Sequence, residues 1–516
     1  MTTSNSTKKT LTIVGGGSAG WMTALYLQRY FHQQGVQIHL IESDKIGPIG
    51  VGEATVHSIR FLFAALGLDE QELMRETNAT LKLGILFRNW MKPSAAGVHE
   101  YFHPFEQQRP AGAIDISSEW VMGQHFNHQR YDQGVCLSSL LAEKSASPKT
   151  PMSRPYQGVV PYGYHLDATL LGQFLRKKGL EAGITYQVAT VTNVNVEDGE
   201  ISSLQTSEGV HQADFYIDCS GFSGKLIDAL QPDNWESFTD VLPCNKAVAI
   251  QRDYAPGETP RPFTTSTALS HGWAWQIDLV NRQGNGYVYD GNRLSAEQAE
   301  AELREFLGDE AATRSALHLD MKVGFRPQSW VGNCVAIGLS SGFIEPLEST
   351  GLHLINVAAR LFATHFSAAN ISDSVRRSFN RQMRGVYEDL KQFIVLHYCL
   401  TDRDDTDFWR QAQASAEGCE GLAEKLTLWK HKVCEFMDLS GGYSTTFNDE
   451  NYRYILYGMG HLPALHLQPS STQNQSLFDQ VNHMAANLLL QTQSHLAYLQ
   501  HLHGKPLFSA KDTRSQ

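Results

Sequence analysis

The stretch Gly15-Gly16-Gly17-Ser18-Ala19-Gly20 constrains the fold most strongly, because it places the pattern GxGxxG between two elements of regular structure. Residues 10–14 before it are apolar and predict a strand, and residues 21–31 after it have the periodicity of a helix. A second apolar run at residues 36–42 predicts another strand. We therefore expect a βαβ unit in which a glycine turn joins the first strand to the helix.

This glycine turn has the chemistry of a dinucleotide site. Its first glycine permits the tight turn, its second lets a pyrophosphate approach the backbone, and its third allows the helix to pack closely on the strand. The amides at the helix N-terminus attract phosphate, and an acid about 20 residues on can accept hydrogen bonds from ribose hydroxyls. The pattern alone does not distinguish FAD from NAD. Contacts with the dinucleotide are expected at Gly15, Gly17, Ser18, Ala19, Gly20 and Glu42.

Composition excludes several other classes of function. The formal net charge is −12, so neither nucleic acid nor an anionic membrane surface is an expected partner. The chain has no run of about 18 uncharged apolar residues, and residues 1–9 do not resemble a signal peptide. A cytoplasmic location is therefore expected. The 7 cysteines are scattered without a CxxC pair, which argues against a disulfide framework and a zinc site, and no metal is expected.

The order of the remaining patterns predicts an α/β fold with α+β additions. We divide the chain into a Rossmann-like core at residues 1–92, an insertion at 93–160, the second part of the core with added β-structure at 161–370, and a helical region at 371–516. The insertion is rich in Pro, Gly, His and Ser and predicts loops with short helices. Later strands are expected at residues 183–196, 201–206, 214–219, 246–252, 273–279, 286–289 and 335–337, and later helices at residues 372–398 and 476–502.

Three further segments resemble those of flavin-dependent tryptophan halogenases. Residues 50–55 read GVGEAT, residues 218–222 follow D-x-S-G-F, and residues 338–351 contain F-x-x-P-x-x-S-x-G. Matches of this kind extend in order to about Gly460. The resemblance implies a core of the flavin-monooxygenase type that binds FAD, with an insertion and a helical C-terminal region that contribute to the substrate site. It also implies FAD contacts at Val51, Gly52, Glu53, Ala54, Val191, Leu339 and Leu352.

Lys82 and Glu348 are the catalytic candidates that this resemblance implies. Lys82 lies in A-x-x-K, followed by F-x-N-W at residues 87–90, where the family places its essential lysine. Without the resemblance, Lys82 would be interpreted as a lysine that extends to the surface, and Glu348 as an acid at a helix start. The implied role of Lys82 is to hold hypohalous acid or to carry the halogen as a haloamine. Glu348 would polarise the acid, stabilise the cationic arene or accept its proton.

Thr350 and Gly351 are the expected halide site. They directly precede a long helical pattern, and amides at a helix start bind anions. An ordinary Ser/Thr N-cap is the alternative interpretation of the same residues. The resemblance favours a halide held by these amides beside the flavin ring.

Aromatic residues predict the substrate side. His103 and Phe105 resemble a family segment that stacks against indole, although a buried His-Pro turn is an equal alternative. Trp273 and Trp275 are similar to the signature W-x-W-x-I-P, but Asp278 replaces its proline, which weakens the case against hydroxylation. Phe447 follows a threonine where free-tryptophan halogenases tend to have a Phe-Trp pair, so indole or a substituted indole competes with tryptophan as the substrate. Glu450 completes the expected substrate contacts.

The resemblance thus implies a halogenase that uses FADH2, dioxygen and chloride or bromide to halogenate an indole-type aromatic. A separate flavin reductase would supply reduced FAD, and a homodimer is common in the family. Two alternatives stay open at this point. One is an FAD-dependent aromatic monooxygenase that transfers oxygen, and the other is a non-catalytic flavin-binding redox protein.

Overall fold

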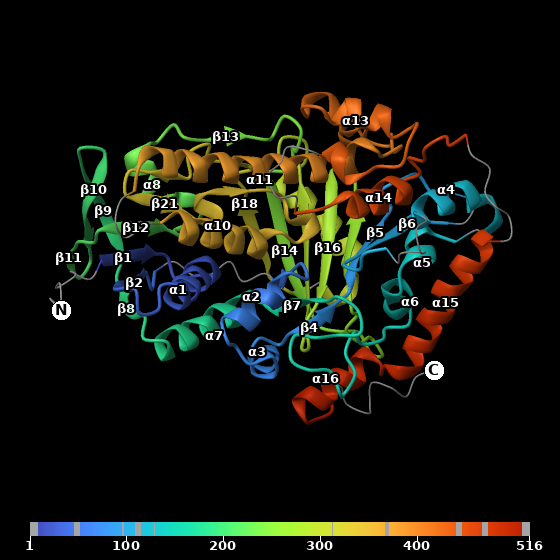
Figure 1. Ribbon diagram of the computed structural model, residues 1–516, viewed down its shortest axis with the longest axis horizontal. Coiled ribbons are helices and arrows are strands. Elements are labelled where there is room, and N and C mark those ends of the chain that lie inside the picture. The colour runs from blue at the N-terminus through green and yellow to red at the C-terminus, as the bar shows by residue number, and fades with distance from the viewer. Residues whose placement is uncertain are drawn as a thin grey trace, which may run out of the picture.

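The computed structural model describes residues 9–45, 52–94, 97–108, 115–127, 129–311, 313–366, 371–439, 446–466 and 473–507. Figure 1 shows two β-layers side by side, with the N-terminal segments around one and the C-terminal helices around the other. Residues from all four predicted segments of the chain share one large hydrophobic core.

The first layer is a six-stranded sheet that contains the predicted βαβ unit. The strands β1, β2, β8, β12 and β21 run parallel, and only β20 is antiparallel to its neighbour. The glycine turn leads from β1 directly into helix α1, as expected from GxGxxG. The sheet order is β20 (Trp330–Val331), β21 (Cys334–Ala336), β12 (Phe215–Asp218), β1 (Lys9–Val14), β2 (Val36–Glu42) and β8 (Thr185–Val188).

Apolar faces of three helices pack with this sheet. Helix α1 lies between the other two in Figure 1, and its residues Trp21, Ala24 and Leu27 are fully buried. A three-stranded sheet of hairpins lies at the left-hand end of the molecule in Figure 1. The helices are α1 (Ser18–Tyr30), α7 (Ala168–Glu181) and α10 (Gly351–His365), and the hairpin strands are β9 (Val191–Glu197), β10 (Glu200–Thr206) and β11 (Gly209–His211).

The second layer is a seven-stranded sheet, and a small sheet joins it to the first. The small sheet carries the residues GEA of the GVGEAT segment and Lys82 on its two edge strands, β3 (Gly52–Ala54) and β4 (Thr80–Lys82), with β7 (Gly163–Asp167) between them. The seven-stranded order is β18 (Ala316–Asp320), β14 (Lys246–Arg252), β17 (Gln283–Tyr289), β16 (Gly272–Asp278), β15 (Thr264–Ala268), β5 (Gly84–Arg88) and β6 (Glu100–Pro104).

Helices of the C-terminal region lie beside both layers, and the longest of them packs against β20 of the first sheet as well as β5 of the second. The longest, α11 (Asp373–Cys399), agrees with the helix predicted at residues 372–398. The helix predicted at residues 476–502 is instead two helices, α15 (Gln473–Gln491) and α16 (His495–His503). Ser494 caps the second of these through the Ala497 amide, so a local side chain–backbone bond interrupts the apolar periodicity.

Helix α16 reaches back to the strand that carries Lys82. The His495 ring is fully buried, and its Nε2 accepts a hydrogen bond from the Leu81 amide at 3.1 Å. Its Nδ1 donates to the Pro260 carbonyl at 3.0 Å. Burial lowers the pKa of His495 to about 4, so the ring is neutral at physiological pH and has one donor and one acceptor, as both bonds require.

The strands of the insertion and of the segment before it differ from the prediction. Residues 80–82, 84–88 and 100–104 are strands, whereas the sequence patterns predicted none there. These strands are short and mostly buried on both faces, so they lack the alternation of polar and apolar residues that marks a strand in a sequence. The expected strand at residues 183–196 is two strands, β8 and β9, that belong to different sheets.

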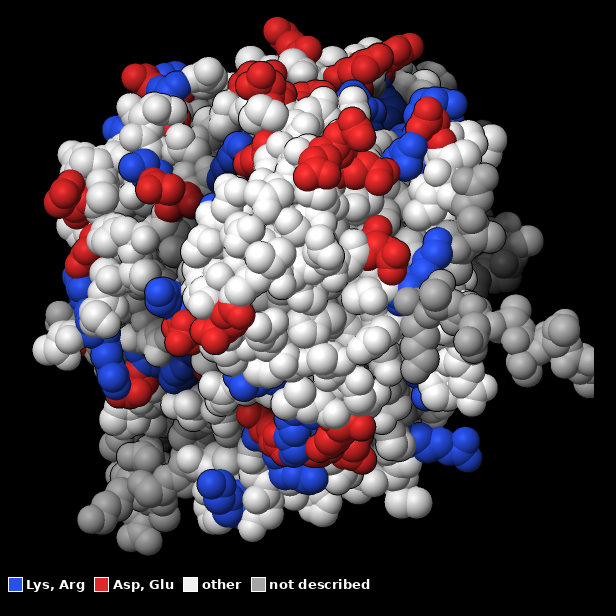
Figure 2. Space-filling model, turned by 90° about the vertical axis from the view of Figure 1, so that its left-hand side faces the viewer, with Lys and Arg blue, Asp and Glu red and all other residues white. Residues whose placement is uncertain are grey.

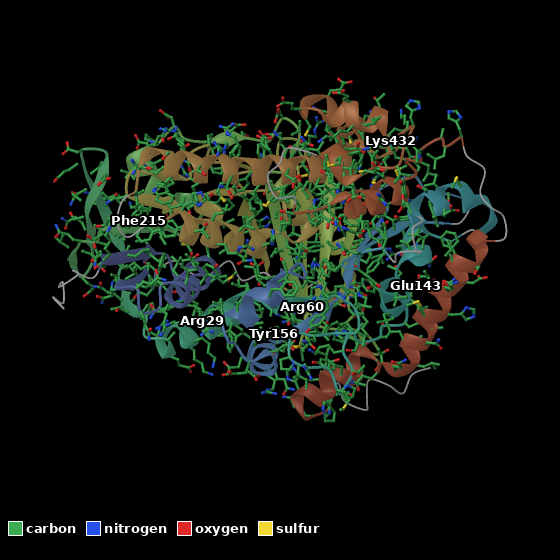
Figure 3. The ribbon with its side chains drawn as sticks, in the orientation of Figure 1. Arg29, Arg60, Glu143, Tyr156, Phe215 and Lys432 are labelled. Carbon is green, nitrogen blue, oxygen red and sulfur yellow. The ribbon has the colours of Figure 1, made fainter. Side chains whose placement is uncertain are left out.

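A buried ion pair holds the loop at residues 144–162 against helix α3 (Glu70–Glu76). Lys149 Nζ lies 2.7 Å from a Glu70 carboxylate oxygen, and the hydroxyls of Tyr162 and Tyr164 donate to the other oxygen. In the same region the Arg60 guanidinium donates to the Tyr156 carbonyl at 3.1 Å (Figure 3).

Replacing Lys149 with methionine is expected to lower the free energy of unfolding by about 3–5 kcal/mol, because it leaves the Glu70 carboxylate buried without its counter-ion. Urea denaturation measures this change. Lys177→Met is the matched control. Its ion pairs with Glu72 and Glu76 lie at the surface, where solvent screens them, so we expect little change in stability. Equal losses in the two variants would contradict the structural importance of the Lys149–Glu70 pair.

Charged side chains surround a broad uncharged area on the face that Figure 2 presents, the side of the molecule with the hairpin sheet. Among the described residues, no helix combines the length and apolarity needed to cross a membrane.

Candidate active site

Lys82 is fully buried at the end of β4, unlike a lysine that extends to the surface. Its Nζ donates a 2.7 Å hydrogen bond to Ser349 Oγ and lies 5.2 Å from the centre of the Phe105 ring. Burial lowers the pKa of Lys82 to about 7, although the Glu348 carboxylate opposes this shift. Ammonium and free amine are therefore both accessible near neutral pH.

Glu348 is the second buried group at this place, in the short 3₁₀ turn Pro346–Glu348. Its carboxylate oxygens lie 2.9 and 3.0 Å from Nδ1 of His103, and Oε1 lies 2.9 Å from Nε2 of His397. Burial by itself would raise the pKa of Glu348, but His103 and His397 outweigh it and lower the pKa to about 2. Glu348 is therefore a carboxylate at neutral pH.

Ser349 connects the two groups. It follows Glu348 in the chain and has φ +61°, a left-handed conformation that is uncommon outside glycine. This conformation ends the turn and presents the hydroxyl to Lys82. The structure thus brings together two residues from distant segments that the family motifs had indicated separately.

His103 lies on β6 with its ring buried, and it is not part of a simple His-Pro turn. Its Nε2 lies 2.9 Å from the Asn451 side-chain amide nitrogen. The Asn451 oxygen accepts from the Asn448 amide, which fixes the orientation of the Asn451 side chain as a donor to His103. Nδ1 of His103 therefore carries the proton that is donated to Glu348.

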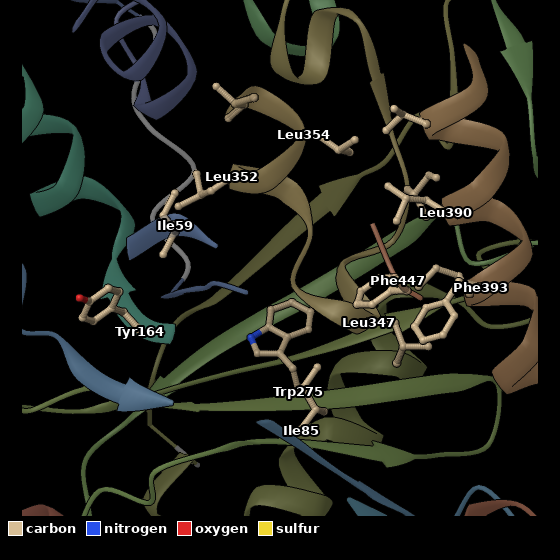
Figure 4. Packing of buried hydrophobic residues seen from close by; sticks show 14 of the residues in the cluster. Ile59, Ile85, Tyr164, Trp275, Leu347, Leu352, Leu354, Leu390, Phe393 and Phe447 are labelled. Carbon is tan, nitrogen blue, oxygen red and sulfur yellow. The ribbon is translucent and has the colours of Figure 1, made fainter. Parts of the chain in front are cut away.

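Aromatic rings line this side of the site. The Phe447 ring stacks on Phe393 with centroids 4.1 Å apart, and it lies 5.8 Å from the His103 ring. Figure 4 shows Phe447 and Phe393 together beside Leu347, the residue that precedes Glu348. Glu450 is farther along helix α14 (Asp449–Gly458), where its carboxylate accepts from the Gln108 amide at 3.1 Å, and burial raises its pKa.

The glycine turn fits a dinucleotide on its open side. A Cβ at Gly15 would lie 2.2 Å from the Cys219 carbonyl oxygen, and one at Gly20 would lie 1.8 Å from the Gly15 oxygen. A Cβ at Gly17 would meet no atom within 4 Å. The turn is therefore tightly packed beneath and open above, as a bound pyrophosphate requires. Glu42 lies directly beside the turn, 2.9 Å from the Tyr186 hydroxyl that donates to it.

The other predicted FAD contacts lie around this turn and the small sheet. Gly338, the neighbour of Leu339, packs against Ala19, and Ser43 at the end of β2 bonds to Thr190, the neighbour of Val191. Leu352 lies in the first turn of helix α10 and near Ile59 in Figure 4. Gly52, Glu53 and Ala54 form β3, and burial raises the pKa of Glu53 to about 7. Val51 lies outside the described residues.

A cavity of about 200 Å³ adjoins Gly52 and Trp275 and has room for part of a flat ring. Its wall includes Gly284 and Asn285 of the seven-stranded sheet. Within the described part of the chain, Asn285 Oδ1 is buried and has no hydrogen-bond partner. An orphaned buried acceptor beside a cavity indicates a site for a ligand that donates a hydrogen bond, as a flavin ring does.

Asp278, which replaces the expected proline, does not enter the site. Its carboxylate is almost fully buried and forms a bidentate ion pair with Arg261 at 2.9 and 3.0 Å. Gln283 donates to the same carboxylate at 2.7 Å. The side chain is fully engaged within the sheet, so we see no physical reason for Asp278 to favour oxygen transfer.

Thr350 and Gly351 begin helix α10, but not as an ordinary cap. Thr350 occupies the N-cap position, and its side chain forms no capping hydrogen bond. The amides of the first helical turn have no intrahelical partners, and the helix dipole adds a partial positive charge. This geometry suits an anion better than the Ser/Thr capping alternative does.

Sequence reasoning missed two further residues of the site, His397 and Asn451. His397 lies in the middle of the regular helix α11, where its 3.6-residue periodicity only indicates a core position. Asn451 completes a capping box with Asn448 at the start of α14, a pattern typical of a helix start. Each residue is explained by its own helix, so the sequence gives no reason to assign it to a site. Only the fold brings His397 to Glu348, and Asn451 to His103 beside it.

Comparisons with known proteins agree with this geometry. The model of the family described as tryptophan halogenase matches residues 10–474. Tryptophan 6-halogenase SttH of Streptomyces toxytricini is 38% identical, over 89% of this chain and 90% of that protein. Tryptophan 7-halogenase RebH of Lentzea aerocolonigenes is 31% identical, over 96% and 98%. The solved structure of Tar14, a tryptophan C-6 flavin-dependent halogenase from taromycin biosynthesis, matches with a TM-score of 0.88 at 35% identity, covering 96% of this chain and 100% of that one.

Proposed function

The chain belongs to the tryptophan halogenase family of flavin-dependent enzymes, and from that membership we propose that it halogenates an indole-type ring at Lys82 and Glu348. The observation that supports this proposal best is the burial of both groups on either side of Ser349. Away from bulk water, their charges and hydrogen bonds act strongly on a small polar oxidant. Tryptophan, indole and substituted indoles are the proposed substrates.

Residues around the glycine turn and β3 would hold FAD, with the pyrophosphate on the amides of Ser18 and Ala19. When bound, reduced FAD would supply part of the electrons that reduce dioxygen, and the halide ion, oxidised in the same reaction, would supply the rest, giving hypohalous acid and water. The amides of Thr350 and Gly351 would hold chloride or bromide at the start of α10. Both groups of amides lie at a helix N-terminus, where unpaired N–H groups and the helix dipole attract an anion.

The chemistry on the aromatic ring rests on Lys82 and Glu348. Lys82 would hold hypohalous acid by a hydrogen bond from its ammonium group, or carry the halogen as a haloamine on its free amine. Glu348, ionised at neutral pH, would accept the proton that the ring carbon releases. His103, Phe105 and Phe447 would hold the ring over Lys82 by aromatic contacts, with Glu450 as a further substrate contact.

We further propose that a separate reductase supplies the reduced FAD, because the sequence contains no evident second nucleotide-binding unit for NAD(P)H. We propose a homodimer solely because homodimers are common in this family.

Mass spectrometry of reactions with reduced FAD, oxygen and each halide tests the function. Tryptophan, indole and several substituted indoles serve as substrates. We expect a product with the isotope pattern of chlorine or bromine, which disappears when both halides are removed. An oxygenated product that forms without halide would instead indicate the monooxygenase. Oxidation of reduced FAD without any change in the aromatic compound would indicate the redox protein.

A further inference from the structure

His397 lies between two hydrogen-bond acceptors. Its Nδ1 is 2.9 Å from the Phe393 carbonyl oxygen, one turn earlier in α11, and its Nε2 is 2.9 Å from Glu348 Oε1. A carbonyl oxygen can only accept, so Nδ1 carries a proton. A neutral imidazole would then have a bare nitrogen directed at Glu348, and one further proton must lie between the two groups.

The other partners of Glu348 indicate on which group that proton resides. His103 donates from Nδ1 to the carboxylate, because Asn451 already donates to its other nitrogen. His103 Nδ1 lies 2.9 Å from Oε2 and 3.0 Å from Oε1, and Oε1 also faces Nε2 of His397. A carboxylate accepts from several donors at once, whereas a protonated carboxyl group would have to use one of these oxygens as a donor.

We propose that His397 is a positioning residue, held as an imidazolium between the Phe393 carbonyl and Glu348, that keeps Glu348 ionised as the acceptor of the ring proton. The inference rests on the proposed function only for the last step, the transfer of the ring proton. The assignment of the proton to His397 rests on these hydrogen bonds together with the lowered pKa of Glu348, and needs no assumption about the reaction.

The surroundings of the pair strengthen this assignment. His397 is fully buried, and the rings of Phe87, Trp90 and Phe393 pack around it. The titratable groups that face Glu348 are His103 and Tyr101 from β6 and Lys82 from β4. Burial raises the pKa of Tyr101 well above its usual value, so this residue stays neutral. On the helix, the next residue, Tyr398, donates to Glu345 and not to Glu348.

The protons balance in this scheme. The carbon–halogen bond forms as the oxygen–halogen bond of hypohalous acid breaks, so the ring carbon is oxidised and the halogen is reduced. The departing oxygen takes a proton from the Lys82 ammonium and leaves as water. The ring proton passes to Glu348 and then to the Lys82 amine, which restores both groups. His397 keeps its two protons throughout.

His397→Gln provides the test, because the amide of glutamine can still donate to Glu348 but carries no charge. Without the imidazolium, burial raises the pKa of Glu348, and the carboxylate is lost at a higher pH. We expect a kcat at least about tenfold below wild type near pH 6, with KM within about twofold. The ratio of variant to wild-type kcat should rise towards one as the pH increases. His461→Gln, at a half-buried histidine bonded to the Leu426 carbonyl, is the matched control and should not change kcat.

A merely structural role for His397 would lower kcat by the same factor at every pH, and that result would overturn the proposal. Nitrogen-15 spectra of ring-labelled histidine give a second measurement that needs neither activity nor flavin. We expect one histidine with two protonated ring nitrogens at neutral pH, which Glu348→Gln converts to a neutral ring. If the wild-type spectrum contained neutral rings alone, the proposal for His397 would be overturned even if halogenation itself were observed. If the doubly protonated signal were present but no halogenation occurred, only the proposed function would be overturned.

Discussion

A Lys82→Met variant is expected to form halogenated product at least about a thousandfold more slowly than the wild type, since it loses the group that holds the halogen near the ring. Methionine fills a similar volume with apolar atoms, so the fully buried site stays packed. Burial disfavours the Lys82 ammonium, as its lowered pKa shows, so the substitution should not reduce stability. Product analysis by mass spectrometry measures the loss.

Oxidation of reduced FAD by oxygen should continue in this variant, because the role proposed for Lys82 is at the substrate and not at the glycine turn. Lys92→Met, at an exposed lysine in the loop after β5, serves as the control and should retain wild-type product formation. Loss of flavin oxidation together with halogenation would contradict the proposed role of Lys82. A wild-type rate that falls as the pH rises through about 7 would favour the ammonium as the active form, and a rising rate would favour the haloamine.

Glu348→Gln is expected to lower kcat by about a hundredfold with little change in KM, because an amide cannot accept the ring proton. The control is Glu345→Gln, which changes another fully buried carboxyl group on the same loop. Glu345 accepts from Trp273 and Tyr398, and burial raises its pKa to about 7, so its neutral form is already populated and an amide replaces it well. Comparable losses in the two variants would contradict a specific role for Glu348.

The stability of the Glu348→Gln variant should also depend on pH in a defined direction. The pKa of Glu348 is lower in the folded protein than in the unfolded chain, so its ionisation stabilises the fold above the unfolded value of about 4.5. That contribution is lost as the pH falls towards 2. The variant should therefore be less stable than the wild type near neutral pH, and the difference should shrink in acid. Urea denaturation at several pH values measures it.

The first layer of the fold could be predicted from sequence because its signals are local. The glycine turn, β1, α1 and β2 agree with the patterns at residues 10–42 to within a few positions. The seven-stranded sheet was predicted only in part, since β5 and β6 are buried on both faces and show no alternation. The pairing of β5 with β15 depends on contacts across a long sequence separation, which no local pattern records, and β6 joins the sheet by pairing with β5.

The candidate site was likewise predicted only in part. Lys82 and Glu348 were indicated by resemblance, while their residue types alone favoured a surface lysine and a helix-start acid. No motif predicted that several hydrogen-bond donors surround Glu348. His103 on β6 and His397 on α11 bond to its carboxylate, and Asn451 on α14 bonds to His103. Each of these side chains has an ordinary role in its own element. Their common acceptor exists only once four separate segments have met.

The hydrogen bond between the Leu81 amide and His495 links the strand that carries Lys82 to a helix that is synthesised last. These two residues are 414 positions apart, so a nascent chain carries its lysine strand long before the ring that secures it has been synthesised. Until α16 docks, the Leu81 amide lacks this partner, and the backbone at Lys82 is held by the pairing of β4 with β7. We therefore expect a chain arrested shortly before residue 495 to contain both Lys82 and Glu348 but to hold the lysine strand less firmly than the complete chain does.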